Sequence, residues 1–156
     1  MTMKSDTCII DSPIGPIIAT ANDHGITSLD FTDEALQITN STNPLLLRLE
    51  TELREYFAGN RQTFTLPLNP HGTEFQKKVW EALRTIPYGK TVSYATEAKM
   101  FGNPKAVRAV ASANAKNPIS ILIPCHRVIA TGGGLGGYSG GLWRKEFLLD
   151  LEKTEV

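Results

Sequence analysis

Ser93-Tyr-Ala-Thr-Glu-Ala-Lys-Met-Phe-Gly-Asn-Pro-Lys-Ala-Val-Arg-Ala-Val-Ala-Ser-Ala-Asn-Ala-Lys116 decides the fold of the second half of this 156-residue chain. Ser93 is a favoured helix N-cap and predicts a short helix to about Met100. Asn103 and Pro104 then predict a second helix, as its cap and first residue, running to about Lys116. Two short helices joined by a tight glycine-containing turn indicate a helix-turn-helix, although purely structural helical hairpins share this pattern.

The second predicted helix consists mainly of small side chains around a single central arginine, Arg108. Alanine favours helix formation, so its abundance here has a simple structural explanation. A functional interpretation is that small side chains let the helix backbone approach another surface, which suits the minor groove of DNA. We expect Arg108 to contact DNA, with Lys105, Ala106 and Ala109 beside it.

Working toward the N-terminus, the two prolines and the glycine within residues 66–72 predict a domain boundary. We therefore expect one domain over residues 1–70 and another over residues 71–156. In the first domain, β-branched and apolar stretches separated by turn-forming clusters predict short strands. The strands are expected at residues 7–10, 17–20 and 26–31, and residues 63–66 are a candidate for one more.

Two further helices carry clear end signals. Asn43 as N-cap, Pro44 at the first position and Gly59 beyond the end predict a helix between them. Thr73 and Gln76 form a capping-box pattern that opens another helix. The inward residues of this second helix are expected to be Phe75, Val79, Trp80 and Leu83.

Composition restricts the class of protein. Residues 1–72 hold four basic and nine acidic side chains, whereas residues 73–156 hold twelve basic and seven acidic ones. The net positive charge of the second half therefore favours binding to phosphate groups, unless the segregation of charge is accidental. No apolar run is long enough to cross a bilayer, and the N-terminus lacks the apolar core of a signal peptide. We expect a cytoplasmic protein without a membrane partner.

Cysteine and histidine are few and scattered. Cys8 and Cys125 are expected to be free thiols in a reducing compartment. Cys8 and His24 do not make a tetrahedral site, so no metal ligand is predicted.

The chemistry of the chain centres on Pro124-Cys125-His126, which follows a buried-strand pattern at residues 119–123. A thiolate is a strong nucleophile, and a neighbouring base or cation lowers the pKa of its thiol. Adjacent residues of a regular strand point to opposite faces, so the two side chains can cooperate only if Pro124 bends the chain or a water bridges them. The alternative is an inert, buried cysteine.

Downstream of the cysteine lie a glycine-rich segment over residues 132–141 and a final amphipathic helix that contains Glu152. The segment is no Walker loop, since the Gly-Lys-Ser/Thr ending is missing. Glu152 stands near a helix C-terminus, where the helix dipole disfavours a carboxylate without a partner. A histidine is the natural partner.

Over residues 73–156 the chain closely resembles the O6-alkylguanine-DNA alkyltransferase family, and the acidic first half matches more weakly through Asp11-Ser-Pro-Ile-Gly15. The matching segments follow the order and spacing of the family: Val92-Ser-Tyr94, Gly102-Asn-Pro-Lys-Ala-Val-Arg-Ala-Val110, Asn117-Pro118, Ile123-Pro-Cys-His-Arg-Val128, Gly137-Tyr-Ser-Gly-Gly141 and Lys145-Glu-Phe-Leu-Leu-Asp-Leu-Glu152.

The resemblance implies an α+β fold, with an N-terminal ribonuclease-H-like α/β domain containing a small antiparallel sheet. The C-terminal domain would be helical with a winged helix-turn-helix. By the family pattern Cys125 accepts the alkyl group, and His126 acts as its base through a water. Glu152 orients the histidine, and Asn117 braces the turn at the active site.

The remaining roles concern the substrate, which the resemblance gives as double-stranded DNA containing O6-alkylguanine, and possibly O4-alkylthymine. Tyr94 would help protonate the leaving purine, and Ser139 would donate to its oxygen. Backbone groups near Cys125 and Val128 would contact its exocyclic amine. Tyr138 would wall the pocket, and Arg108 would fill the gap left by an extruded nucleotide. Since a thioether does not revert to a thiol, the implied activity is that of a single-turnover methylated-DNA–protein-cysteine S-methyltransferase, which needs no cofactor. We expect it to act as a monomer.

Three other classes of protein are alternatives. An alkylation-lesion-binding protein without turnover is the main alternative, although such proteins carry another residue in place of Cys125. A cysteine hydrolase is disfavoured, because its base is not normally adjacent to its nucleophile in sequence. A transcription factor would use the helix-turn-helix alone and would not require Cys125, His126 and Glu152 together.

Overall fold

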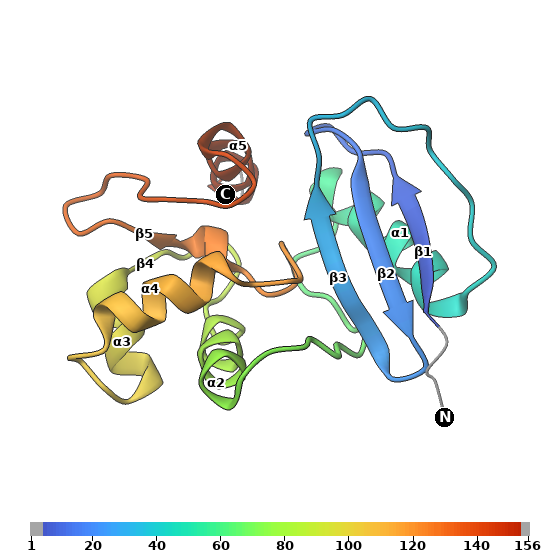
Figure 1. Ribbon diagram of the computed structural model, residues 1–156. Helices are drawn as coiled ribbons and strands as arrows, with labels where there is room; N and C mark the ends of the chain where they lie inside the picture. The colour runs from blue at the N-terminus through green and yellow to red at the C-terminus, as the bar shows by residue number, and fades with distance from the viewer. Residues whose placement is uncertain (1–4, 154–156) are drawn as a thin grey trace. The chain divides into compact units, whose positions relative to one another are not determined.

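The computed structural model describes residues 5–153, which fall into two compact units divided between His71 and Gly72. Figure 1 shows strands and one helix in the first unit and mainly helices in the second. The change of character falls within the proline-rich segment that the sequence marks as a boundary.

The N-terminal unit is a three-stranded antiparallel sheet with one helix. Its strands β1 (Asp6–Ile10), β2 (Ile17–Asn22) and β3 (Gly25–Phe31) pair in sequence order. Helix α1 (Pro44–Phe57) begins at Asn43, whose side chain accepts hydrogen bonds from two backbone amides. The helix contacts all three strands, and its buried residues include the apolar stripe that the sequence predicts. The stripe consists of Leu46, Leu49, Leu53 and Tyr56.

One sequence-based expectation in this unit is wrong. Residues 63–66 form no strand, and the only bridge in this region pairs Leu68 with Ile26 of β3. The backbone amide of Thr65 instead donates to the buried carboxylate of Glu52 on α1, 3.1 Å away. A side chain therefore takes the place of a neighbouring strand.

The C-terminal unit consists of four helices, a short 3-10 helix and a two-stranded parallel pairing in its described residues. These elements are α2 (Glu74–Leu83), β4 (Val92–Ser93), α3 (Tyr94–Phe101), α4 (Val107–Ala115), η1 (Cys125–Arg127), β5 (Val128–Ile129) and α5 (Leu142–Lys153). The predicted capping box at Thr73 and Gln76 is present. Helices α2, α3 and α4 pack against one another, and the indole Nε1 of Trp80 donates to the carbonyl of Ala113 at 2.9 Å.

The helix-turn-helix is α3 and α4, with two differences from the sequence-based expectation. Gly102 ends α3 in a left-handed conformation, but α4 begins at Val107 rather than Pro104. Asn103 caps an intervening turn instead, since its side chain accepts from the amide of Lys105. Phe75 is not inward but partly exposed, and its ring packs edge-on against that of Phe101 at 5.0 Å.

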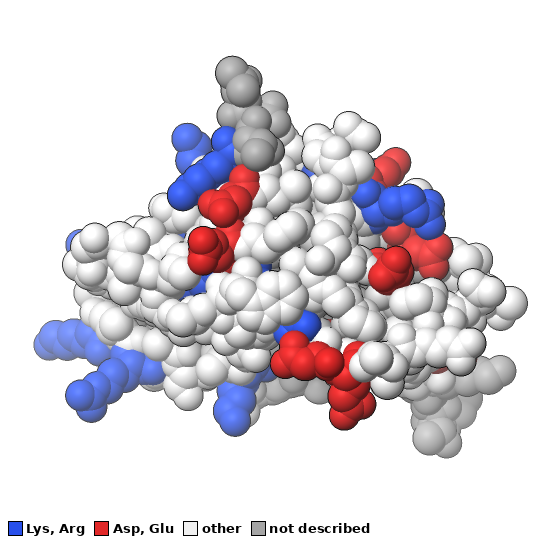
Figure 2. Space-filling view, turned by 90° about the horizontal axis from the view of Figure 1, so that it is seen from above, with Lys and Arg blue, Asp and Glu red and all other residues white. Residues whose placement is uncertain are grey.

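No described helix is both long and apolar enough to cross a membrane. Figure 2 shows Lys and Arg side chains projecting at its left end, the side on which α3 and α4 lie in Figure 1. Exposed cations near this helix pair agree with the basic balance of the second half of the sequence.

Candidate active site

The segment before Cys125 is a buried turn and not the expected strand. Residues 119–123 are buried but follow no extended path, and Ile121 adopts a left-handed conformation with φ of 70°. Asn117 explains this path: its Oδ1 accepts from the amide of Ile119 at 2.9 Å, and its Nδ2 donates to the carbonyl of Ile123 at 2.8 Å. One amide side chain thus clamps both ends of the turn.

The turn delivers Cys125 and His126 into a 3-10 helix, η1, where they no longer lie on opposite faces of a strand. Pro124 precedes it with φ of −82° and ψ of 63°, which provides the bend that the sequence required. Nδ2 of Asn117 also donates to Cys125 Sγ at 3.2 Å. No direct hydrogen bond joins Cys125 to His126 among the described residues, and Nδ1 of the buried imidazole has no protein partner there.

The other imidazole nitrogen is held firmly. His126 Nε2 donates to Glu152 Oε2 at 2.8 Å, and both side chains are almost completely buried. Arg127 donates to both oxygens of the same carboxylate, from Nε at 2.8 Å and from Nη2 at 3.0 Å. Burial alone would raise the pKa of Glu152, but these hydrogen bonds outweigh it and hold the pKa far below its ordinary value. Burial lowers the pKa of His126, so the imidazole is neutral.

The electrostatics of Cys125 keep its thiol protonated at rest. Burial raises the pKa of the thiol to about 11, while Asn117 and the cation of Lys145 lower it. Lys145 is fully buried, and its Nζ donates to the carbonyls of Val128 at 2.6 Å and Gly137 at 3.1 Å. Burial lowers the pKa of Lys145 in turn.

Arg127 and Lys145 were missed as site residues by the sequence-based reasoning. Charged side chains are usually exposed, so neither identity nor spacing indicated that both are buried here. One signal was available: Arg127 directly follows the buried Cys125-His126 pair, where an unpaired cation would be costly.

A pocket of about 410 Å³ opens onto the thiol. Its wall combines groups from α3, α4, η1 and the glycine-rich segment. The lining residues are Tyr94, Ala111, Asn114, Ala115, Cys125, Gly137, Tyr138 and Ser139. The structure therefore places four of the sequence-predicted residues around one cavity: Tyr94, Cys125, Tyr138 and Ser139.

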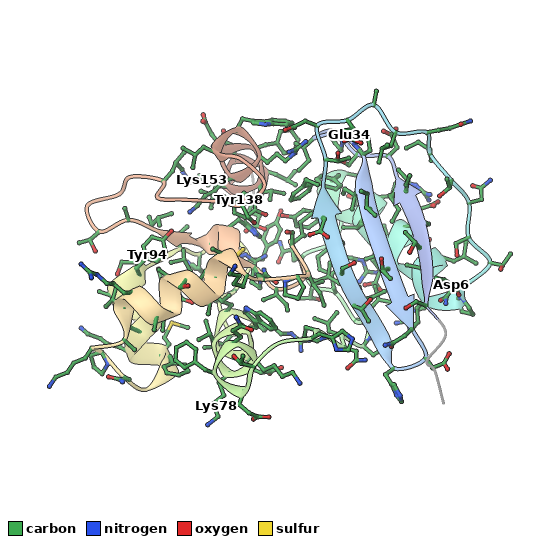
Figure 3. All side chains as sticks on the ribbon, in the orientation of Figure 1. Asp6, Glu34, Lys78, Tyr94, Tyr138 and Lys153 are labelled. Carbon is green, nitrogen blue, oxygen red and sulfur yellow. The ribbon has the colours of Figure 1, made fainter. Side chains whose placement is uncertain are left out.

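Two tyrosines shape this pocket, and both are labelled in Figure 3. The amide of Gly137 donates to the hydroxyl of Tyr94 at 3.3 Å. Gly136 has a positive φ, and a Cβ there would lie only 2.8 Å from the same hydroxyl oxygen, so this close approach requires glycine. Burial raises the pKa of Tyr138 well above its ordinary value and keeps this phenol neutral.

The remaining predicted residues do not line the pocket. Val128 is buried, and its carbonyl accepts from Lys145. On the helix-turn-helix, Lys105, Arg108 and Ala109 are exposed and Ala106 is half-buried. Helix α4 thus contributes Asn114 to the pocket, while its exposed residues Arg108 and Ala109 are available for an external surface.

In residues 5–153 no group of three or more His, Cys, Asp or Glu side chains is arranged to hold a metal ion. A buried thiol and a neutral, carboxylate-held histidine in the same unit as a helix-turn-helix are the arrangement expected of the class of DNA-binding proteins that react through a cysteine.

Comparisons with known proteins name the family. Residues 74–154 match the family model described as "6-O-methylguanine DNA methyltransferase, DNA binding domain", and residues 8–70 match its "ribonuclease-like domain". The chain belongs to the 6-O-methylguanine DNA methyltransferase family, and the predicted fold class is confirmed.

Similar proteins support this membership along nearly the whole chain. A methylated-DNA–protein-cysteine methyltransferase of Methanosarcina acetivorans is 46% identical over 149 residues, covering 92% of this chain and 96% of that protein. The crystal structure of O6-methylguanine methyltransferase from Mycobacterium tuberculosis matches with a TM-score of 0.87 and 41% identity, covering 98% of this chain and 95% of the other. A structure of the Mycobacterium tuberculosis protein in complex with DNA matches with a TM-score of 0.83 and 44% identity, covering 94% and 91%.

Proposed function

We propose that this protein repairs DNA by transferring the alkyl group of O6-alkylguanine to Cys125 Sγ, once per polypeptide. The observation that carries the proposal is the pocket of about 410 Å³ with the thiol in its wall. This volume lies within the range of about 300–1,000 Å³ that is typical of small-molecule sites. It suits one nucleobase and excludes a duplex, so the target nucleotide must leave the helix before it reacts.

The reaction is a displacement at carbon. The sulfur attacks the alkyl carbon, a C–S bond forms, and the bond between that carbon and O6 breaks. The thiol proton leaves the sulfur and the purine gains a proton, so that the products are an S-alkylcysteine and ordinary guanine. The thioether does not release the alkyl group, and the protein therefore acts stoichiometrically.

His126 serves as the base in this scheme. Its Nδ1 is the free nitrogen and has no protein partner among the described residues, so a water between it and Cys125 Sγ would carry the proton. When His126 becomes an imidazolium, the carboxylate of Glu152 stabilises the new charge, as the third member of a catalytic triad does. Arg127 keeps that carboxylate ionised and in place.

Side chains and backbone groups of the pocket wall contact the target guanine. Tyr94 donates a proton toward the leaving purine, Ser139 donates to its oxygen, and Tyr138 covers the base. Backbone groups near Cys125 and Val128 contact the exocyclic amine, and Asn117 fixes the turn that holds the sulfur.

The helix-turn-helix delivers the DNA. The exposed side of α4 offers Arg108 to the space left by the extruded nucleotide, and Lys105 contacts phosphate. Ala106 and Ala109 are small and let the helix backbone come close to the minor groove. We propose that the protein acts as a monomer.

The test is the intact mass of the protein after incubation with duplex DNA that carries O6-methylguanine. The mass should rise by one CH2 group, as a methyl replaces the thiol hydrogen, and the reaction should end at one equivalent. Cys125→Ala should bind the lesion without gaining mass, whereas Cys8→Ala, which changes the other buried cysteine, should react normally. Product formation beyond one equivalent would contradict the proposal, as would an unchanged wild-type mass.

A further inference from the structure

Glu97 is a buried acid that the mechanism above does not use. It lies on α3, three residues after Tyr94, and its side chain is completely buried. Its Oε1 accepts from Asn114 Nδ2 at 2.6 Å. Oε2 has no partner among the described residues, and no ion pair in this part of the chain involves Glu97.

Asn114 connects this acid to the pocket. Its side chain is buried on α4 and lines the same cavity as Cys125 and Tyr94. Its Oδ1 is also buried without a partner in the described residues. Two adjacent buried side chains therefore share a single hydrogen bond and leave two acceptor oxygens unsatisfied. Such an arrangement is costly for an ionised carboxylate and much less so for a neutral one.

The charge of Glu97 affects the pKa of the Cys125 thiol. A negative charge on Glu97 raises the pKa of the Cys125 thiol, because two anions in one desolvated site repel each other. Catalysis requires the sulfur to become anionic. A proton on Glu97 removes this repulsion while the sulfur is anionic.

We propose that Glu97 is a positioning residue of the transfer reaction, which fixes the pocket-wall amide of Asn114 and must carry a proton while the Cys125 sulfur is anionic. The proposal rests on the alkyl transfer proposed above. Glu97 gives up no proton in the reaction: the thiol proton still leaves through His126, and Glu97 is protonated before and after.

Among the described residues, the helices and strands that pack against α3 contain no other buried charged side chain. Helix α3 packs against α2, α4, β4 and β5, and neither strand contains a charged residue. The charged side chains of the helices are exposed. They are Glu74, Lys77, Lys78 and Glu81 on α2, Lys99 on α3 itself and Arg108 on α4. Burial raises the pKa of Glu97 to about 7, so the proton is lost within an accessible pH range.

The test compares wild type with Glu97→Gln, whose amide imitates the neutral acid at every pH. The rate of benzyl transfer from free O6-benzylguanine to the protein is measured by intact mass from about pH 5.5 to about pH 9. The ratio of the variant rate to the wild-type rate should be near one at the acid end. It should rise with a midpoint near 7 and level off at about tenfold, which corresponds to one pKa unit on the sulfur. Glu146→Gln, an exposed substitution of the same kind on α5, should follow wild type throughout.

A second variant tests the link through Asn114. The hydrogen bond from Asn114 lowers the pKa of Glu97, so Asn114→Leu should move the pH at which ionisation of Glu97 begins to slow the transfer to a higher value. A purely structural role of Glu97 predicts no such movement. This measurement also decides the question if Glu97→Gln does not fold, as judged by circular dichroism.

The outcomes separate the two proposals. A wild-type protein that gains no benzyl group contradicts the alkyl transfer itself. If wild type reacts but the rate ratio is independent of pH, only the role of Glu97 is overturned. A Glu97→Gln protein that is folded yet much slower at every pH would likewise overturn it, because a carboxylate would then be required.

Discussion

Glu152 near the end of α5 and Glu97 within α3 are both buried carboxyl groups of the C-terminal unit. The pKa of the first is lowered and that of the second is raised. Glu152 accepts hydrogen bonds from His126 and Arg127 and is held ionised. Glu97 has one neutral partner, Asn114, and keeps its proton up to about pH 7. Burial is nearly equal at the two positions, at 2% and 0% exposure. The hydrogen-bond partners of each carboxyl group, and not its degree of burial, therefore decide which acid is ionised.

The difference matters because each state suits its task. In the proposed reaction, an ionised Glu152 would stabilise the imidazolium formed when His126 accepts the thiol proton. By our proposal, a neutral Glu97 would avoid electrostatic repulsion of the Cys125 thiolate. Exchanging the two states would oppose the reaction at both positions.

The largest effect is expected from Arg127→Met, which would remove the two hydrogen bonds that Arg127 donates to the Glu152 carboxylate. Removing one partner of a buried ion pair costs about 3–5 kcal/mol, and we expect this loss in the free energy of unfolding at pH 7. Urea unfolding measures it. Arg84→Met removes an exposed cation with a 3.5 Å ion pair and should cost less than about 1 kcal/mol. Equal losses in both variants would show that Arg127 does not set the state of Glu152.

The same variant should change the response to acid. In wild type the lowered pKa of Glu152 stabilises the folded state above the ordinary pKa of 4.5, and this stabilisation is lost as the pH falls toward the folded value. With Arg127 removed the folded pKa rises, so this acid-dependent part of the unfolding free energy should shrink.

A smaller effect of opposite sign is expected from Glu97→Gln. The folded pKa of about 7 lies above the ordinary value of 4.5, so ionisation of Glu97 destabilises the fold increasingly between these two pH values. Above pH 7 the penalty is constant. The glutamine variant avoids it and should be more stable than wild type by on the order of 2–3 kcal/mol at pH 8, with no gain below pH about 4. Urea unfolding at both pH values measures this, and a loss of stability at pH 8 would contradict it.

The smallest effect is expected from Lys145→Met, which removes the buried cation that opposes the influence of Glu97 on the sulfur. Loss of this charge should raise the pKa of Cys125 and slow benzyl transfer about tenfold at pH 7.5. Lys153→Met, at an exposed position of the same helix, serves as control. An unchanged rate for Lys145→Met would remove Lys145 from the electrostatics of the site.

Local signals predicted most of the fold. Asn43, Ser93 and the capping box at Thr73 are short-range features, and each begins a helix as expected. The errors arose where distant side chains decide the path. Residues 119–123 have the apolar character of a buried strand, but hydrogen bonds from Asn117 fold them into a turn.

The candidate site was predictable to a similar degree and for a similar reason. Cys125, His126 and Glu152 belong to motifs whose residues and spacing are visible in the sequence, and the structure brings His126 into contact with Glu152. Glu97, Arg127 and Lys145 are charged residues whose burial depends on packing between helices. No periodic pattern distinguishes a buried charge from an exposed one, so only the folded structure reveals them.

The burial of the Cys125 sulfur has a consequence for the protein before it encounters damaged DNA. A thiol with a pKa of about 11 is almost entirely protonated at neutral pH, and it is only 7% exposed. Peroxide and other oxidants attack the thiolate, so the resting sulfur is protected against the first step of the oxidation ladder. A protein that reacts only once benefits from this low reactivity at rest. Each molecule whose sulfur is oxidised beforehand can no longer accept an alkyl group, and one lesion stays unrepaired.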